Sequence, residues 1–217
     1  MHITSVNVGQ PREVLWKGKT IQTGIFKAPV AGPVAVLADR LVGDAQADRR
    51  VHGGPEKAIY AYDLAHYAFW QPQLPNTILT PGIFGENLTT SGLPDYEVCL
   101  GDTFAVGTAV LVALQPRLPC VKLGLRFNDA HFVRQLQEAQ RSGIYFGVRQ
   151  PGQVQAGDAL VLLERATHGL TIQDITDQFY RPDKQADQLA ALLAQPLLPA
   201  FFQESFRRML QATRQPT

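Results

Sequence analysis

The first 165 residues consist of short apolar stretches separated by glycine and proline, such as Ala58 to Tyr62 and Ala109 to Leu114. Stretches of this length, bounded by turn residues, are typical of β-strands. Val14 to Trp16 and Ile21 to Ile25 flank Lys17-Gly18-Lys19, which predicts a β-hairpin. The other predicted strands are Ile3 to Val8, Val34 to Leu37, Phe104 to Val106, Ile144 to Val148 and Ala159 to Leu163. Many short strands with few helices favour a closed or semi-closed β-barrel.

Two helices are expected to interrupt these strands. Asp63 is placed to cap the first, because an aspartate side chain can accept from the free amides of a first helical turn. Asn128-Asp129 is placed in the same way before the second helix, which carries Phe132 and Leu136 at helical spacing. The fold class is therefore mainly β with some α.

The composition changes near residue 168, because no glycine follows Gly169 and helix-forming residues dominate. Thr171-Ile172-Gln173-Asp174 resembles a capping box and predicts a helix to about Tyr180. A second helix is expected to begin near Pro182, and a third to carry Phe202 and Phe206. We therefore expect a β-barrel domain over residues 1–167 and a three-helix appendix over residues 168–217. The sequence leaves open whether the appendix covers a pocket or forms a homodimer contact.

Composition and charge exclude several classes of protein. The chain is 45% hydrophobic and 18% charged, which is enough for an ordinary globular core. A net charge of +1, and acidic residues that offset the arginines of the C-terminal helices, give no basic face for nucleic acid. No apolar run is long enough to span a membrane, and we expect no signal peptide. The two cysteines predict a cytoplasmic protein with free thiols.

Cys120 is the most informative candidate site residue. It follows an apolar strand and the segment Gln115-Pro116-Arg117-Leu118-Pro119, whose prolines stiffen the backbone into a turn. Arg117 and Lys122 are close in sequence, and nearby cations favour a thiolate. The alternative is that Cys120 is a small buried apolar residue, as free cysteines often are. Arg117 is suited to a phosphate or an oxyanion, or else to an ion pair with Glu86.

Two further segments carry polar residues that barrels rarely need for packing. In Arg49 to Ala58, Gly53-Gly54 allows backbone amides to approach a ligand, and His52 and Lys57 stand on either side as donors. In Phe84-Gly85-Glu86-Asn87, a carboxylate and an amide can face a pocket, and the amide suits a pterin or purine edge. The alternatives are a plain turn, a structural histidine and an asparagine bonded to its own turn.

Together these segments resemble the MOSC domain family. The resemblance rests on Val51-His52-Gly53-Gly54-Pro55, Phe84-Gly85-Glu86-Asn87-Leu88, Gly101-Asp102, and Gln115-Pro116-Arg117 through Pro119-Cys120-Val121-Lys122-Leu123, in that order. It spans roughly residues 1–165. The three-helix appendix is similar to that of the stand-alone, YiiM-type branch. Gly-Asp also recurs at Gly157-Asp158, which we interpret as turn chemistry rather than a repeat.

The resemblance implies a MOSC β-barrel that binds molybdenum cofactor, a molybdopterin whose dithiolene holds the metal. Cys120 would be the protein's only ligand to molybdenum, since soft thiolates suit such a centre. Catalysis would involve Cys120 with Arg117 and His52, which offset charge or supply a proton, as Lys122 also could. By the same resemblance, the cofactor-binding residues are His52, Gly53, Gly54, Lys57, Glu86, Asn87, Arg117 and Lys122.

The first functional hypothesis is a molybdenum-dependent reductase of small N-hydroxylated compounds, with detoxification of N-hydroxylated nucleobases as one role. Because the chain has no flavin, haem or iron–sulfur motif, electrons would come from a separate reductase. The second hypothesis is a sulfur carrier for cofactor assembly, in which Cys120 holds a persulfide. The sequence does not decide between them.

Overall fold

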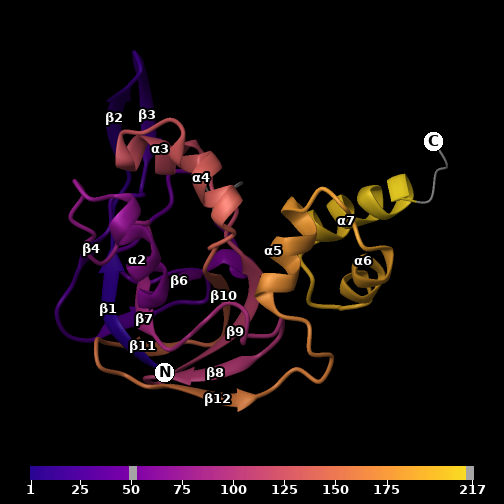
Figure 1. Cartoon of the computed structure of the whole chain (residues 1–217). Coiled ribbons are helices and arrows are strands. Elements are labelled where there is room, and N and C mark those ends of the chain that lie inside the picture. The colour runs from indigo at the N-terminus through magenta and orange to yellow at the C-terminus, as the bar shows by residue number, and fades with distance from the viewer. Residues whose placement is uncertain (49–52, 214–217) are drawn as a thin grey trace.

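A curled antiparallel sheet forms the body of the protein, with helices at one edge and along one flank (Figure 1). This computed structural model describes residues 1–48 and 53–213. The strands are β1 (His2–Val8), β2 (Arg12–Trp16), β3 (Lys19–Thr23), β4 (Ala28–Pro29), β5 (Val34–Val36), β6 (Ile59–Asp63), β7 (Leu88–Ser91), β8 (Thr103–Val106), β9 (Ala109–Pro116), β10 (Ile144–Gln150), β11 (Gly152–Val154) and β12 (Leu160–Glu164). The helices are η1 (Pro55–Lys57), α2 (Leu64–Trp70), η2 (Gln71–Gln73), α3 (Val121–Phe127), α4 (Phe132–Ala139), α5 (Ile172–Tyr180), α6 (Ala186–Leu193) and α7 (Ala200–Thr213).

The main sheet has eight strands in the order β12-β8-β9-β10-β6-β7-β1-β4. All neighbours are antiparallel except β6 and β7, which run parallel. The sheet curls until the start of β12 meets β1, where Ile3 N donates to Asp158 O over 2.8 Å and Leu160 N donates to Met1 O over 3.0 Å. These bonds pair backbone groups that an open edge would leave exposed, as a barrel requires. The expected β-barrel with helices after it is therefore confirmed.

The predicted hairpin forms from β2 and β3, which pair only with each other and project from the barrel beside α3 (Figure 1). Its two-residue turn is Lys17-Gly18, with φ angles of 50° and 73°. Both angles lie in the left-handed region, which a hairpin turn of this kind requires and which glycine adopts at little cost. Lys19, expected in the turn, is the first residue of β3.

The first predicted helix is confirmed, and the second begins later than expected. Asp63 caps α2 by accepting from Ala65 N over 3.0 Å. Residues 121–127 form α3, which was not predicted, and Asn128 ends it in the left-handed conformation. The expected cap at Asn128-Asp129 is therefore wrong, because Asn128 closes one helix and α4 begins only at Phe132. Asp129 instead accepts from the amide of His131 over 2.8 Å.

Helix α5 packs on the outside of the barrel against β9, and α6 and α7 lie beyond it (Figure 1). The capping box at the start of α5 is confirmed, since Thr171 Oγ1 accepts from Asp174 N and Asp174 Oδ2 accepts from Thr171 N. Backbone hydrogen bonds from Leu100 N to Leu170 O and from Ile172 N to Val98 O hold the start of α5 against the barrel. No helix in the described part of the chain is long and apolar enough to cross a membrane.

Two hydrophobic clusters stabilise the fold. The larger one joins the barrel interior to the C-terminal helices, so that Phe104 and Phe146 belong to the same cluster as Leu192, Phe202 and Phe206. The smaller one lies between the sheet and helices α2, α3 and α4, and is mainly aromatic; it is built from Ile25, Tyr60, Tyr62, Tyr67, Trp70, Ile83, Phe84, Leu123, Phe132 and Leu136. The two clusters lie on opposite faces of β6, which alternates its side chains between them.

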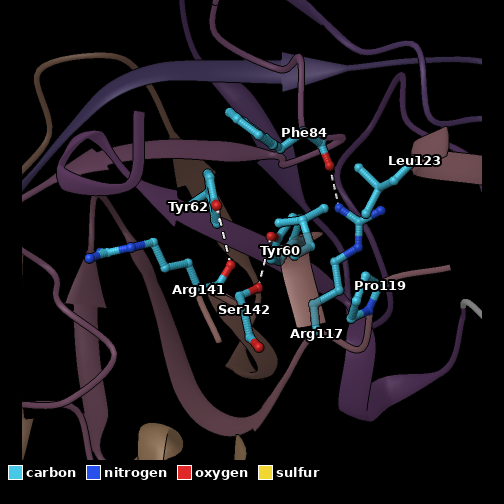
Figure 2. Close-up of a pocket in the computed structure, with 9 residues that line it drawn as sticks. Tyr60, Tyr62, Phe84, Arg117, Pro119, Leu123, Arg141 and Ser142 are labelled. Atoms are coloured by element: carbon cyan, nitrogen blue, oxygen red, sulfur yellow. Dashed lines mark hydrogen bonds between the residues drawn. The ribbon is translucent and has the colours of Figure 1, made fainter. Parts of the chain in front are cut away.

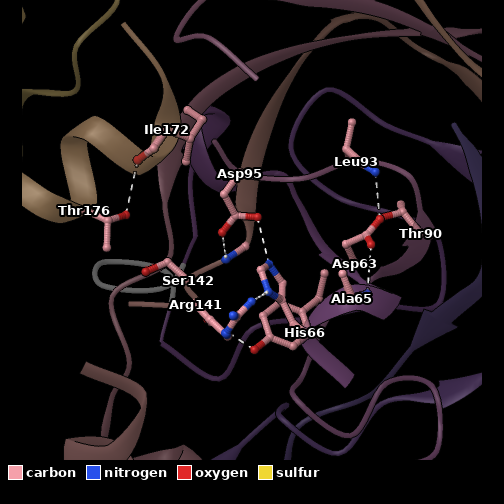
Figure 3. Close-up of polar contacts among 12 residues, drawn as sticks. Asp63, Ala65, His66, Thr90, Leu93, Asp95, Arg141, Ser142, Ile172 and Thr176 are labelled. Carbon is pink, nitrogen blue, oxygen red and sulfur yellow. Dashed lines mark hydrogen bonds and ion pairs between the residues drawn. The ribbon is translucent and has the colours of Figure 1, made fainter. Parts of the chain in front are cut away.

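His66, Asp95 and Arg141 form a polar network (Figure 3). His66 Nε2 lies 2.9 Å from Asp95 Oδ1, and His66 Nδ1 lies 3.3 Å from Arg141 Nη1. Because a guanidinium only donates, Nδ1 is the acceptor and the Nε2 proton points at Asp95. Asp95 also accepts from Gly143 N through its side chain and from Gln173 N through its carbonyl. One aspartate thereby connects α2, the start of β10 and α5.

The shared cluster predicts that the C-terminal helices contribute to the stability of the whole chain. Phe202→Ala removes a side chain that is 0% exposed and should lower the free energy of unfolding by about 3–5 kcal/mol. The matched control is Phe201→Ala on the same helix, where 51% of the residue is exposed and the loss should be much smaller. Urea unfolding measures both. Equal losses would show that the cluster is not a common core.

Candidate functional site

Cys120 lies between the end of β9 and the start of α3. The strand ends at Pro116, and Cys120 takes the extended N-cap position of α3 with φ of −129° and ψ of 168°. Pro119 precedes it and disfavours helical backbone at Leu118, and the extended backbone of Cys120 places the start of the helix at Val121. Cys120 is partly exposed, and Cys99, the other cysteine, is buried elsewhere; both thiols are free, as expected.

The thiol lines an open pocket. Four chain segments that are distant in sequence meet there. The described lining residues are Thr23, Gly24, Ile25, Lys27, Ala45, Gln46, Gly85, Arg117, Cys120 and Lys122. The structure therefore brings Arg117, Cys120 and Lys122 together, as their spacing predicted, and adds the lysine at position 27.

Arg117 forms one wall of this pocket. Its side chain is buried, Nη1 donates to Phe84 O, and the guanidinium lies 4.7 Å from the centroid of the Tyr60 ring (Figure 2). The guanidinium therefore bonds a backbone carbonyl, and this is not the expected ion pair with Glu86. Gly85 allows this approach, since a Cβ there would lie 2.9 Å from Ile25 Cγ1 and 3.5 Å from Arg117 Nη1, and its φ is 81°. The glycine is thus required both by space and by conformation.

Glu86 lies behind the pocket wall and is 0% exposed. Its carboxylate accepts from Tyr67 Oη, from Gly82 N over 2.7 Å, from Phe84 N over 3.1 Å and from Thr89 Oγ1 over 2.8 Å. Burial raises its pKa, and the hydrogen bonds from Tyr67 and Gly82 oppose this shift. These hydrogen bonds hold the loop that contains Gly85 in place. Contact of Glu86 with a cofactor stays a prediction.

Asn87 is also buried and does not bond its own turn. Its Oδ1 accepts from Tyr60 N over 3.1 Å, and its Nδ2 donates to Asp44 Oδ2 over 3.0 Å. All of these partners belong to other segments, so Asn87 fastens β6 to the loop that contains Asp44. A cofactor contact of the amide likewise stays a prediction.

Sequence reasoning missed Lys27, which lines the pocket, and Asp44, which pairs with it. Lys27 Nζ lies 2.6 Å from Asp44 Oδ2, and the two side chains are 9% and 0% exposed. Asp44 Oδ1 accepts from Gly9 N over 2.9 Å. The residues are 17 positions apart in irregular segments, so no periodic pattern marks them. The only local signal is a lysine between an aromatic residue and Ala28-Pro29.

The described part of the glycine-rich segment lies next to the end of β9, just before the loop that carries Arg117 and Cys120. Gly54 has a φ of 99°, which favours glycine, and begins η1. Gln115 Nε2, two residues before Arg117, donates to Glu56 O over 3.1 Å. Burial lowers the pKa of Lys57, and Glu56 opposes this. Gly53, Gly54 and Lys57 do not line the described pocket wall, and His52 lies outside the described residues, so the roles of all four stay predictions.

A second, smaller pocket shares Arg117 with the first. Tyr60, Tyr62 and Phe84 give it aromatic walls, and the two tyrosine hydroxyls donate to Ser142 O and Arg141 O (Figure 2). Within residues 1–48 and 53–213, no three histidine, cysteine or acidic side chains gather where they could hold a metal ion.

The repeated Gly-Asp pairs are turn structures, as interpreted. Gly101 and Gly157 have φ angles of 91° and 93°. Asp102 accepts from Cys99 N over 2.9 Å, and Asp158 accepts from Gln155 N over 2.8 Å. Each aspartate thereby closes its own turn.

Fold and site together define a curled β-domain that presents one cysteine thiol among basic side chains in an open pocket. The chain belongs to the MOSC domain family, whose model matches residues 48–161. The Bacillus subtilis (strain 168) protein YflK is 37% identical over 95% of this chain and 93% of its own length. The crystal structure of YiiM from Geobacillus stearothermophilus has a TM-score of 0.81 and 34% identity over 96% of this chain and 98% of that one. The YiiM-type branch is thereby confirmed.

A third relative is longer than this chain. A protein named "Reductase" from Gibberella moniliformis (strain M3125 / FGSC 7600) is 30% identical over 91% of this chain, which spans 36% of that protein. Membership of the MOSC family is consistent with binding of molybdenum cofactor.

The geometry of Glu86 predicts a stability effect that needs no cofactor. Glu86→Gln should lower the free energy of unfolding by about 1–3 kcal/mol, because the amide group would turn a donor towards the buried Phe84 N–H. Glu97→Gln, at an exposed position, is the control and should change little. Denaturant unfolding of cofactor-free protein decides this, and equal stability of the two variants would contradict the role of Glu86 in holding the loop.

Proposed function

We propose that this protein is a molybdenum-cofactor-dependent reductase of N-hydroxylated compounds, with Cys120 as the protein's ligand to the metal. The observation that carries the proposal is the position of this partly exposed thiol in a pocket that Lys27, Arg117 and Lys122 also line. A soft thiolate suits a metal already held by a dithiolene, and the cations of Arg117 and Lys122 suit the anionic groups of a pterin phosphate. The residues present therefore fit the cofactor.

Each side chain has a distinct task in this proposal. The bound cofactor would supply the two-electron redox chemistry that the chain's own side chains lack. Cys120 would hold the metal, and Arg117 would keep a permanent positive charge beside it, because a guanidinium does not lose its proton. The bond from Arg117 to Phe84 O keeps that charge in place. Lys122, two residues after the thiol, would bind an anionic group of the cofactor.

We propose N-hydroxylated nucleobases as substrates, and one comparison supports the reductase activity. The relative from Gibberella moniliformis is named as a reductase, and this chain corresponds to about a third of it. We propose that electrons come from a separate reductase protein and that the enzyme works in the cytoplasm.

The competing function is a sulfur carrier in which Cys120 holds a persulfide. The same open pocket and basic side chains would activate a sulfane sulfur as readily as they would bind a phosphate. Mass spectrometry of freshly purified protein separates the two functions. The reductase proposal expects bound pterin and an unmodified thiol, whereas a carrier would show an added sulfur atom and no pterin.

Metal analysis tests the ligand directly. Loss of an outer partner of a metal ligand already costs about 10–100-fold in affinity, so Cys120→Ala should retain at most about a tenth of the wild-type molybdenum. Cys99→Ala changes the only other cysteine, which is buried away from the pocket, and should retain wild-type content. Proteins from a cofactor-competent host are compared by elemental analysis and pterin fluorescence. Equal molybdenum in wild type and Cys120→Ala would show that Cys120 is not the ligand.

A further inference from the structure

Lys27 is a buried lysine whose side chain reaches the pocket of Cys120. Only 9% of its side chain is exposed, yet it lines the pocket together with Cys120 and Arg117. Burial of an ammonium group is costly unless the charge is paired, so a lysine kept at such a position needs a compensating partner. Asp44 is that partner, at 2.6 Å.

The surroundings of Lys27 leave it little freedom. Its backbone N donates to Ile25 O over 3.0 Å, and a Cβ on Gly82 would lie only 2.8 Å from Lys27 O, so the main chain is closely packed. Asp44 is fixed in turn by Gly9 N and by Asn87 Nδ2, at 2.9 and 3.0 Å. The amine is therefore held at one place on the pocket wall.

Three charged groups act on this amine besides the effect of burial. Burial lowers the pKa of Lys27 most strongly; Asp44 raises it, Arg117 lowers it and Glu86 raises it, and the net direction is downwards. A lysine whose pKa lies below the ordinary 10.5 gives up its proton more readily than an exposed one. Arg117, the other buried cation of the pocket, cannot donate a proton in this way.

We propose that Lys27 is the proton donor for the oxygen atom that leaves an N-hydroxylated substrate as water. The inference rests on the proposed function. In that reaction the N–O bond of the substrate would break with the uptake of two electrons, which the bound, reduced cofactor would supply. One proton passes from Lys27 Nζ to the departing oxygen, a second comes from solvent, and the products are the amine and water. Lys27 then regains its proton from water in the open pocket.

Two substitutions separate proton donation from charge and from cofactor binding. Lys27→Met removes both the proton and the charge, while Lys27→Arg keeps the charge but holds its proton too tightly to donate. Lys19→Met on the exposed β2–β3 hairpin is the matched control and should behave as wild type. Molybdenum and pterin per protein, thermal stability and kcat with a defined N-hydroxylated base and a chemical reductant are measured for each.

Both Lys27 variants should keep wild-type molybdenum and pterin while kcat falls about 10²-fold or more. Loss of the cofactor from Lys27→Met and Lys27→Arg would make Lys27 an anchor and overturn the proposal. Retention of more than about a tenth of kcat by Lys27→Arg would show an electrostatic role and overturn it as well. Wild type that holds cofactor but reduces no N-hydroxylated base would contradict the proposed function. That result can be told apart from cofactor loss in the Lys27 variants and from retained kcat in Lys27→Arg.

The pH dependence provides a readout that a structural role would not change. Because the donor must be protonated, wild-type kcat should be constant at low pH and fall as the pH rises through the lowered pKa of Lys27. Asp44→Asn removes the carboxylate that raises this pKa, so the fall should move to lower pH. A fall at the same pH in wild type and Asp44→Asn would contradict proton donation by Lys27.

Discussion

Two buried carboxylates, Asp44 and Glu86, hold together the loops that surround the Cys120 pocket. Asp44 binds Lys27, Asn87 and the amide of Gly9, while Glu86 closes the turn that presents Gly85. Neither carboxylate is open to solvent, so each depends on its hydrogen-bond donors to remain there. Among the described residues, Asp44 Oδ1 and Glu86 Oε2 each accept one hydrogen bond, from Gly9 N and Phe84 N, so loss of that bond would leave a buried acceptor unpaired.

This arrangement explains how a mainly apolar β-domain can keep positive charge at its surface pocket. Lys27 and Arg117 are both buried, yet their partners differ: a carboxylate for the lysine, and a carbonyl and an aromatic ring for the arginine. The arginine therefore keeps its net charge for a ligand, whereas the lysine is neutralised in part and is better suited to exchange a proton. The same pocket wall thus offers two chemically different cations to whatever Cys120 holds.

Local patterns predicted the elements that local chemistry determines. The hairpin at Lys17-Gly18, the Asp63 cap and the Thr171–Asp174 capping box all depend on residues a few positions apart, and all three formed as expected. Helix α3 was missed because Pro116 and Pro119 indicate a turn and Gly124 weakens the helical pattern. In fact, Gly124 is needed, since a Cβ there would lie 2.9 Å from Asp129 O.

The site was predictable only where its residues are neighbours in sequence. Arg117, Cys120 and Lys122 share a pocket because one short segment carries them. Lys27 and Asp44 meet only after the strands have paired, and the sequence does not show whether Glu86 points to the pocket or behind it. These are consequences of topology, which residue spacing does not encode.

The central claim is that Cys120 supplies a sulfur ligand to molybdenum, and X-ray absorption at the molybdenum edge tests it most directly. The account expects wild type to show one sulfur neighbour more than the dithiolene alone provides, and Cys120→Ser, prepared with enough cofactor to load it, to lose that neighbour. An identical sulfur shell in the two proteins would contradict the account.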